Sequence, residues 1–327
     1  MEKRRRGAVN CFFLSFFFTV YTTWLSPHPG NHVVEPNSLL FRPWEHTLSS
    51  TTKLSKSCRD FIYYTVLVEH SLLERDRHAL TLGPNISKPY RGCAVLLLLS
   101  LLEPQIEGVN RNSDVSRYED LGWYVVSATS KISATLGRRI SRFPKLHAST
   151  FFPFTDRTLY VDTKYLKVTV SVEAFHLAST LLRDSQFGII QHPRSGSLME
   201  ERDAIYIARK FRPSIVDSSE NLELQVLRLN SSLSSLQQTL FGVEGKLLAQ
   251  KLRGKSNSRL FDATWLQEFL MGSDRDQIAF YGAAARLELE RIHRDPCSTF
   301  DRAGLYESRV DRSFHMQIFC DFESLVL

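Results

Sequence analysis

The apolar residues of this chain form short continuous runs and longer stretches with helical spacing. Short continuous runs are typical of buried strands, and apolar residues that recur every three or four positions are typical of helices. The runs predict strands at 93–102, 122–128, 157–162, 186–192 and 245–252. The spacing predicts helices at 59–82, 172–183, 198–211, 221–240, 262–271 and 274–293. Strands separated by helices indicate an α/β fold, with a mainly parallel sheet flanked by helices.

The first residues follow a different pattern, in which a basic cluster precedes an uncharged apolar run. Four basic residues at 3–6 and Gly7 come before residues 8–25, AVNCFFLSFFFTVYTTWL. About twenty apolar residues span a bilayer as a helix, so this run predicts a transmembrane segment. Basic flanks stay on the cytoplasmic side, so residues 1–7 are expected to be a cytoplasmic tail and the rest of the chain to be lumenal.

A cleaved signal peptide would begin in the same way, with basic and then apolar residues. The run here is longer than the usual apolar core of a signal peptide. Bulky Tyr21, Trp24 and Leu25 also stand where cleavage prefers small residues. We therefore favour an uncleaved signal anchor. Either kind of segment directs the chain into the secretory pathway.

Beyond the anchor, residues 26–56 are rich in Pro, His, Ser, Thr and Asn and lack periodicity, which predicts a stem. Residues 57–327 are then one lumenal domain. Sequons at Asn85 and Asn230 would be glycosylated if they lie on a lumenal surface. The cysteines beyond the anchor permit two disulfides in three connectivities, with buried free thiols as the alternative. They are Cys58, Cys93, Cys297 and Cys320.

The composition is that of an ordinary globular protein. Hydrophobic residues make up 43% of the chain and charged residues 23%, with a formal net charge of +6. Four of the basic residues belong to the N-terminal cluster. No group of Lys and Arg with interleaved aromatic residues appears elsewhere, so nucleic acid is not among the predicted partners.

The sharpest local signal is the predicted strand end Tyr160-Val161-Asp162-Thr163-Lys164. In parallel sheets, ligands bind beyond the carboxyl ends of the strands. A carboxylate there offers a hard oxygen ligand to a divalent cation, and a neighbouring Lys neutralises phosphate oxygens. Asp also ends many strands because it starts turns, so a structural role for Asp162 is the alternative.

A second polar group, Ser273-Asp274-Arg275-Asp276-Gln277, precedes a predicted helix. Capping of that helix explains most of the pattern. The ion-paired polar set near an upstream Trp also suits a sugar, which is held by hydrogen bonds and aromatic stacking.

A third group, Gln191-His192-Pro193-Arg194, ends another predicted strand. His192 would face the same rim as Asp162 if the two strands are neighbours. A lone His is more often structural than catalytic.

Together these groups resemble the TOD/MUCI-type glycosyltransferase-like proteins. In that family an Arg and a Lys precede an apolar-Phe-Pro element and a strand that ends in Trp/Tyr-x-Asp-x-Lys. The run RRISRFPKLHASTFFPFTDRTLYVDTKYLK, residues 138–167, matches it with Arg139, Lys145, Phe152-Pro153 and Asp162-x-Lys164.

The family then continues with a strand ending in His-Pro or His-Arg, an acidic helix, a Trp-containing helix and an Asp-Gln motif. The matching residues are Gln191 to Arg194, Glu200 to Ala204, Trp265, and Ser273 to Phe280. The resemblance covers about residues 120–290.

The resemblance implies a GT-A-like nucleotide-sugar fold and hexosyl transfer in the Golgi membrane by a single-pass type II protein. The donor would be a nucleotide sugar with Mn²⁺ or Mg²⁺, and the acceptor a glycan, glycoprotein or glycolipid. By this resemblance Asp162 would bind the metal. Lys164, with Arg139 and Lys145, would meet the diphosphate.

The resemblance also implies the residues nearest the chemistry. Asp276 and Gln277 would face the sugar or the acceptor. His192, as a further catalytic candidate, and Arg194, as a donor-binding candidate, would lie on the rim.

A catalytically inactive carbohydrate-binding or scaffolding protein of the same family is the alternative. The family's first strand usually leads into a small-residue loop near the nucleotide, and residues 93–108, CAVLLLLSLLEPQIEG, lack that pattern. A secretory hydrolase finds no support, because the sequence contains neither Gly-x-Ser-x-Gly nor His-Glu-x-x-His.

Overall fold

The computed structural model describes much of the chain after residue 43, in segments. These segments are residues 44, 51, 54–68, 84, 92–101, 111–130, 134–169, 172–191, 197–211, 219–232, 243–253, 256–272, 275–295, 303–320 and 325. All of them belong to one compact unit, residues 36–327.

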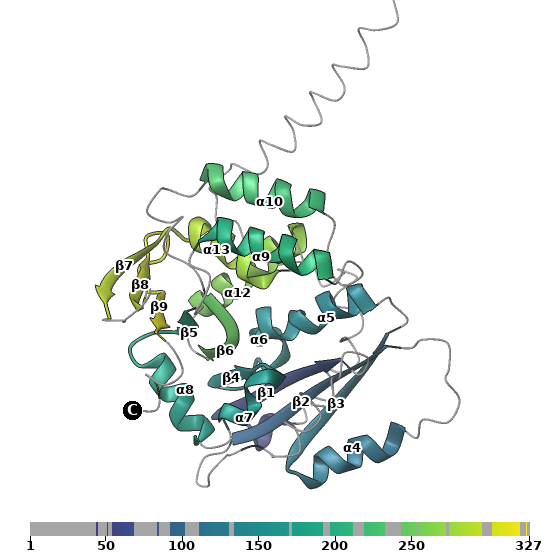
Figure 1. Cartoon of the computed structure of the whole chain (residues 1–327). Coiled ribbons are helices and arrows are strands. Elements are labelled where there is room, and N and C mark those ends of the chain that lie inside the picture. Colours follow the sequence, from purple (N-terminus) through teal and green to yellow (C-terminus); the bar gives the residue numbers. More distant parts are fainter. Residues whose placement is uncertain are drawn as a thin grey trace, which may run out of the picture. The chain divides into compact units, whose positions relative to one another are not determined.

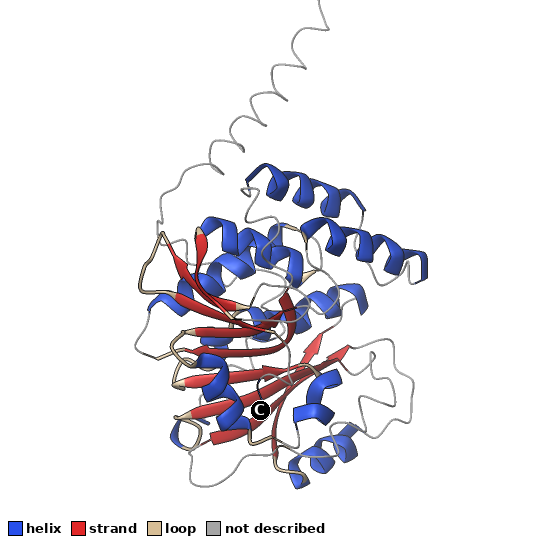
Figure 2. Cartoon of the chain, turned by 60° about the vertical axis from the view of Figure 1, so that its left-hand side comes forward, coloured by secondary structure: helices blue, strands red, loops and turns tan. Residues whose placement is uncertain are grey.

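A nine-stranded sheet lies at the centre of this unit, with strand order β3-β2-β1-β4-β6-β5-β9-β8-β7 (Figures 1 and 2). The strands are β1 Phe61–Val68, β2 Gly92–Leu101, β3 Trp123–Ser130, β4 Arg157–Val161, β5 Phe187–Gln191, β6 Val243–Lys251, β7 Leu289–Arg294, β8 Gly304–Ser308 and β9 His315–Phe319.

Strand directions show that this is a mixed sheet. β1 pairs in parallel with β2 and β4, β2 with β3, and β5 with β9. The other pairs, β4 with β6, β6 with β5, β9 with β8 and β8 with β7, are antiparallel. Among the described strands, only β6 and β8 therefore run against the rest. The predicted α/β class is confirmed. The sheet is mainly parallel in that most strands run in one direction, but it is mixed because several neighbouring pairs are antiparallel.

The helices form layers on both faces of the sheet. They are η2 Leu54–Lys56, α4 Arg111–Asp120, α5 Ala134–Leu146, α6 Ala148–Phe151, η4 Thr163–Tyr165, α7 Leu166–Thr169, α8 Ala174–Leu182, α9 Leu198–Phe211, α10 Ser219–Ser232, α12 Ser256–Met271 and α13 Asp276–Arg286.

Alternation along β4 separates the two faces. Leu159 and Val161 join the buried cluster that contains residues of α4, α7 and α8. Tyr160 points the other way, where its ring packs against Tyr64 and lies near Lys145 of α5. On this second face α12 packs against α5 and α6, while α9 and α10 lie outside α13 (Figure 1).

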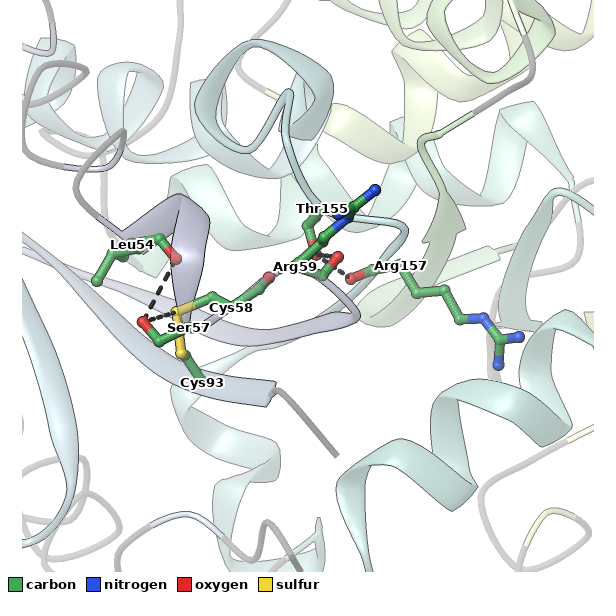
Figure 3. Close-up of a disulfide and its surroundings, with 7 residues drawn as sticks. All are labelled: Leu54, Ser57, Cys58, Arg59, Cys93, Thr155 and Arg157. Carbon is green, nitrogen blue, oxygen red and sulfur yellow. Dashed lines mark hydrogen bonds between the residues drawn. A yellow bond between two sulfur atoms is a disulfide. The ribbon is translucent and has the colours of Figure 1, made fainter. Parts of the chain in front are cut away.

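A disulfide between Cys58 and Cys93 joins the segment before β1 to the second residue of β2 (Figure 3). Beside it, the Thr155 hydroxyl donates to the carbonyl oxygens of Cys58, at 3.0 Å, and of Arg59, at 3.1 Å. Cys320 is disulfide-bonded as well. The bonded alternative predicted for these three cysteines is therefore the one observed.

All five predicted strands are present. The predicted strands at 93–102, 122–128, 157–162, 186–192 and 245–252 correspond to β2, β3, β4, β5 and β6. Among the predicted helices, 198–211 has the observed bounds of α9, and those at 172–183, 221–240 and 262–271 overlap α8, α10 and α12.

The predicted helix at 59–82 is wrong where the structure describes it, because residues 61–68 form β1. The segment FIYYTVLV is rich in aromatic and β-branched residues, which favour strands. Nearly all of its residues are buried, since helices cover both faces. A strand buried on both faces has no alternation of polar residues, so its apolar positions also fit a helical spacing.

The predicted helix at 274–293 is correct only in part. Helix α13 ends at Arg286, and Glu288 adopts a φ of 46°, in the left-handed region that terminates helices. Residues 289–294 then form β7. No element was predicted after residue 293, where β8 and β9 complete the sheet.

The predicted tail and anchor, residues 1–25, and the sequon at Asn85 lie outside the described residues. None of the described helices is long and apolar enough to cross a membrane. Part of the predicted stem packs into the folded unit, since Trp44 is fully buried and its indole N–H donates to the Ile140 carbonyl at 3.1 Å. Asn230, the second sequon, lies exposed on α10.

Candidate active site at the carboxyl edge

The topology brings the ends of β1, β4 and β5 (Val68, Val161 and Gln191) to one edge of the sheet, which we call the carboxyl edge. β6 runs antiparallel to β4 and β5 and starts from this edge: Val161 pairs with Leu247, and Gln191 pairs with Val243. The strand order reverses between β1 and β4. In open α/β sheets, such a reversal opens the crevice in which ligands bind.

Asp162 follows β4 directly at this edge. Its Oδ1 accepts a hydrogen bond from the Lys164 amide at 3.0 Å, so it caps η4, and its own amide donates to the Lys246 carbonyl at 2.8 Å. The side chain is half-buried, and it forms no ion pair with any described residue. Lys164 is exposed, and its ammonium has no partner in the described part of the chain.

Asp276, by contrast, is bound by two cations in the protein interior. Its Oδ2 pairs with Lys145 Nζ, and its Oδ1 lies 3.2 Å from Arg142 Nε. Asp276 is only 3% exposed and Lys145 only 5%. Burial alone would raise the pKa of Asp276, but the charges of Lys145 and Arg142 outweigh burial and hold this pKa well below its usual range.

Aromatic rings and a backbone contact fix this ion pair in place. Lys145 Nζ lies 5.5 Å from the centre of the Tyr160 ring and 5.8 Å from that of Trp265. The Trp265 indole N–H donates to the Asp276 carbonyl at 2.8 Å. Lys145 is therefore held between two aromatic faces, which attract a cation.

Gly245 of β6 makes room for the pair and connects it to Asp162. A Cβ on Gly245 would lie 2.8 Å from Asp276 Oδ2 and closer still to Lys145 Nζ. The next residue, Lys246, accepts the Asp162 amide hydrogen bond. Two consecutive residues of β6 thus contact both carboxylate-bearing segments, so Asp162 and Asp276 belong to one site.

Tyr160 lies between the two acids. Burial raises the pKa of its hydroxyl well above the usual value, and the charges of Asp162 and Asp276 raise it further. Its hydroxyl therefore stays protonated. Tyr160 precedes Asp162 by two residues along the chain.

Arg139 lies on α5 with Arg142 and Lys145 but has other contacts. Its guanidinium donates to the carbonyls of Phe269 at 3.0 Å and Leu270 at 3.3 Å, and it stacks over the Phe269 ring. These are carbonyls of the last turn of α12, where a positive charge also complements the helix dipole. The geometry gives Arg139 a contact that stabilises the end of α12.

Gln277 follows Asp276 in the first turn of α13. Its side-chain oxygen is buried and accepts no hydrogen bond from a described residue. His192, Arg194, Ser273 and Asp274 lie outside the described residues, so their predicted roles remain predictions.

Three residues of this site were not among the predicted site residues: Arg142, Tyr160 and Gly245. Tyr160 belongs to the predicted strand-end motif, but no role was assigned to it. Arg142 was detectable, because it lies three residues from both Arg139 and Lys145 and so shares their helix face. Gly245 carries no such signal, since its role depends on a contact between α5 and α13.

The carboxyl edge fits the cation and diphosphate that the resemblance implies. Magnesium bound to a nucleotide is held by one or two carboxylates together with phosphate oxygens. Asp162 offers one carboxylate without an ion-pair partner among the described residues, and Lys164 offers a cation to the phosphates. Among the described residues, no group of three His, Cys, Asp or Glu forms an all-protein metal site.

Comparison with known proteins places the chain in a family. Residues 100–302, more than half of the chain, match the family described as TOD1/MUCI70, glycosyltransferase-like domain. The chain therefore belongs to this glycosyltransferase-like family, as its motifs predicted. A comparison with curated proteins finds no match.

Two glycosyltransferases are among the similar solved structures. The apo form of mouse xyloside xylosyltransferase 1 is 13% identical, with a TM-score of 0.35, over 69% of this chain and 81% of that chain. The apo WbbM bifunctional glycosyltransferase is 8% identical, with a TM-score of 0.39, over 69% of this chain and 37% of that chain.

Proposed function

We propose that the protein is a GT-A-like glycosyltransferase that moves a hexose from a nucleotide sugar to a glycan, glycoprotein or glycolipid acceptor. The observation that carries this proposal is the position of Asp162 and Lys164. Both follow β4 at the point where the strand order reverses, and neither side-chain charge is neutralised by a described residue. Family membership supports the same function.

Asp162 and Lys164 are assigned to the donor. Asp162 would hold Mn²⁺ or Mg²⁺, which when bound stabilises the charge that develops on the leaving diphosphate. The Lys164 ammonium would neutralise negative charge on the phosphates of the donor. The Asp162 carboxylate is oriented in advance by the Lys164 amide, because that hydrogen bond fixes one of its oxygens.

Asp276 and Gln277 are assigned to the sugar and acceptor side. Both oxygens of Asp276 are already occupied by Lys145 and Arg142, so Asp276 fixes the first turn of α13. Gln277, the next residue, then offers its amide to a sugar hydroxyl. His192 and Arg194 are proposed to complete the rim, because β5 ends at this edge directly before them.

We further propose that the protein acts in the Golgi membrane, anchored by residues 8–25. The disulfide between Cys58 and Cys93 supports a secretory location, because disulfides persist in oxidising compartments. The alternative, a carbohydrate-binding or scaffolding protein without activity, is favoured by the sequence after β2, which lacks the small-residue loop usual in the family.

The test is a donor screen on the full-length protein, with and without Mn²⁺, in which release of nucleoside diphosphate is measured. Replacement of Asp162 by Ala should lower turnover by about a hundredfold or more, because the cation loses its protein ligand. Asp156→Ala is the matched control, since Asp156 precedes β4 at the opposite edge and pairs only at the surface with Arg253, at 3.4 Å.

The wild-type protein should release nucleoside diphosphate from at least one donor, and Asp156→Ala should do so at the wild-type rate. Wild-type turnover by Asp162→Ala would remove Asp162 from the mechanism. Binding of nucleotide sugars without turnover by the wild-type protein would favour the inactive alternative.

A further inference from the structure

Gln191, the last residue of β5, has a buried side-chain oxygen without a hydrogen-bond donor. The residue is 4% exposed, and its Oε1 accepts no hydrogen bond from any residue that the structure describes. Buried polar atoms in native proteins nearly always have a partner, and those without one call for an explanation. A ligand at this position would supply the missing donor.

The pleat of β5 directs this oxygen toward the candidate active site. Ile190 belongs to the buried cluster under α8, so Ile189 and Gln191 face the other side of the sheet. On that side the Phe187 ring lies 4.5 Å from the ring of Phe261 of α12. Tyr160, Lys145 and Trp265 are on the same side, so Gln191 and the Lys145–Asp276 pair share one layer between the sheet and α12.

The position along the edge indicates which part of a ligand would meet Gln191. β5 is separated from β4 by one strand, β6, so Gln191 lies about 10 Å across the sheet from the end of β4. With the diphosphate proposed at Asp162 and Lys164, a sugar attached to it would extend across β6 toward Gln191. It lies on the side of β4 away from β1 and the strand reversal.

The chemistry of the oxygen narrows the ligand further. An amide oxygen only accepts hydrogen bonds, and a diphosphate at neutral pH has only acceptors. A sugar ring offers hydroxyl donors at almost every carbon. The partner that fits is therefore a hydroxyl group and not a phosphate.

We infer that Gln191 is a sugar-binding residue whose amide oxygen accepts a hydrogen bond from a sugar hydroxyl at the carboxyl edge. This inference rests on the proposed function for the position of the diphosphate. Gln191 discriminates among sugars by the position of the hydroxyl that reaches it, because a sugar that lacks this hydroxyl leaves the buried oxygen unpaired.

The experiment compares Gln191→Met with Thr158→Val in the full-length protein. Met keeps the size of Gln and removes the unpaired oxygen. Thr158 lies on the same face at the other end of β4, is 1% exposed, and its hydroxyl oxygen is likewise without a partner in the described part of the chain. Thr158→Val thus repeats the removal of a buried unpaired oxygen, but away from the carboxyl edge.

Affinities for UDP, UDP-glucose, UDP-galactose and UDP-xylose with Mn²⁺ are measured by calorimetry, together with Tm and turnover. Methyl glycosides added with UDP test whether the hydroxyl belongs to the acceptor instead of the donor. Gln191→Met should keep the wild-type affinity for UDP and an equal or higher Tm. The additional affinity that the sugar provides should fall about tenfold, either for the nucleotide sugars or for the methyl glycosides added with UDP. Thr158→Val should keep every affinity.

Wild-type sugar affinities in Gln191→Met would overturn the inference and leave the proposed function standing. A lowered Tm or failure of this variant to fold would overturn it too, because the oxygen would then have a structural partner. Sugar binding without turnover by the wild-type protein would refute the proposed function and leave Gln191 as a sugar-binding residue. Absence of any sugar binding by the wild-type protein would refute both.

Discussion

A carboxylate that is buried between two cations needs both of them to offset the cost of burying its charge. Loss of one partner from such a pair typically costs about 3–5 kcal/mol, because the remaining charge is left unpaired in the interior. Asp276, Lys145 and Arg142 form such a group, and the absence of a side chain at Gly245 provides the space for it.

We predict that Gly245→Ala lowers the free energy of unfolding by about 2 kcal/mol or more, because the added methyl group displaces Lys145 from Asp276. Denaturant unfolding measures this change. In a Lys145→Ala background the same substitution should cost much less, because the closest atom, Lys145 Nζ, is then absent. The two effects should therefore not be additive. Additive effects would show that Gly245 acts independently of the pair.

A second buried carboxyl group, Asp262 of α12, makes stability depend on pH. Asp262 is fully buried and accepts a hydrogen bond from Gln250 Nε2 at 2.9 Å. Burial raises its pKa from 3.8 to about 8, although hydrogen bonds from Ser149 and Gln250 oppose this. The folded protein therefore keeps a proton that the unfolded chain releases, and stability falls as pH rises between these two values.

His147 acts in the opposite sense over the lower part of that range. Burial, together with the charge of Arg259, lowers its pKa from 6.5 to about 4, so its contribution to stability rises with pH up to about 6.5. Between pH 6.5 and 8, His147 no longer changes the stability, so the decrease caused by Asp262 is the effect that remains. We predict a fall of about 1–2 kcal/mol in the free energy of unfolding over this interval.

Asp262→Asn should remove this fall, because Asn keeps the size and the acceptor oxygen but does not titrate. The measurement is Tm against pH at constant ionic strength. An unchanged pH profile in Asp262→Asn would assign the dependence to another group.

At the scale of elements, helix α5 presents Arg139, Arg142 and Lys145 along one face, and these cations have different tasks. Arg139 contacts the last turn of α12, whereas Arg142 and Lys145 bind the first residue of α13. One helix thus fixes the end of α12 and the start of α13. The segment between them carries the predicted polar motif of residues 273–277.

We predict that Arg139→Ala lowers the free energy of unfolding by about 1 kcal/mol and leaves the affinity for UDP with Mn²⁺ unchanged, because its guanidinium serves the carbonyls of α12. Lys164→Ala should weaken the binding of UDP with Mn²⁺ and leave the free energy of unfolding unchanged. Lys164 is exposed and has no partner among the described residues. Denaturant unfolding and calorimetry separate the two effects. Weaker UDP binding in Arg139→Ala would return Arg139 to the diphosphate site.

For the whole molecule, the sequence indicated the fold class and the segments of the site but not their contacts. β2, β4 and β5 were predictable because continuous apolar runs ended at turn residues. β1 was not, because a strand buried on both faces has no polar alternation and fits two periodicities at once. β8 and β9 are short and half polar, so their pairing in the sheet depends on partners distant in the sequence.

The candidate site shows the same limit. The positions of Asp162 and Lys164 follow from local sequence, because residues directly after a strand lie at the carboxyl end of that strand. Lys145 and Asp276 are 131 residues apart in the sequence, and their ion pair depends on how α5, β6 and α13 pack. No local pattern encodes a contact of that range.

The bond between Cys58 and Cys93 has a practical consequence for anyone who makes this protein. Both sulfurs lie where β1 and β2 begin, and β1 is the strand against which β4 and Asp162 are aligned. A host cytosol that keeps thiols reduced would yield a chain in which this bond does not join the starts of β1 and β2. Absence of activity in such material would then reflect the missing disulfide and would not test the proposed function.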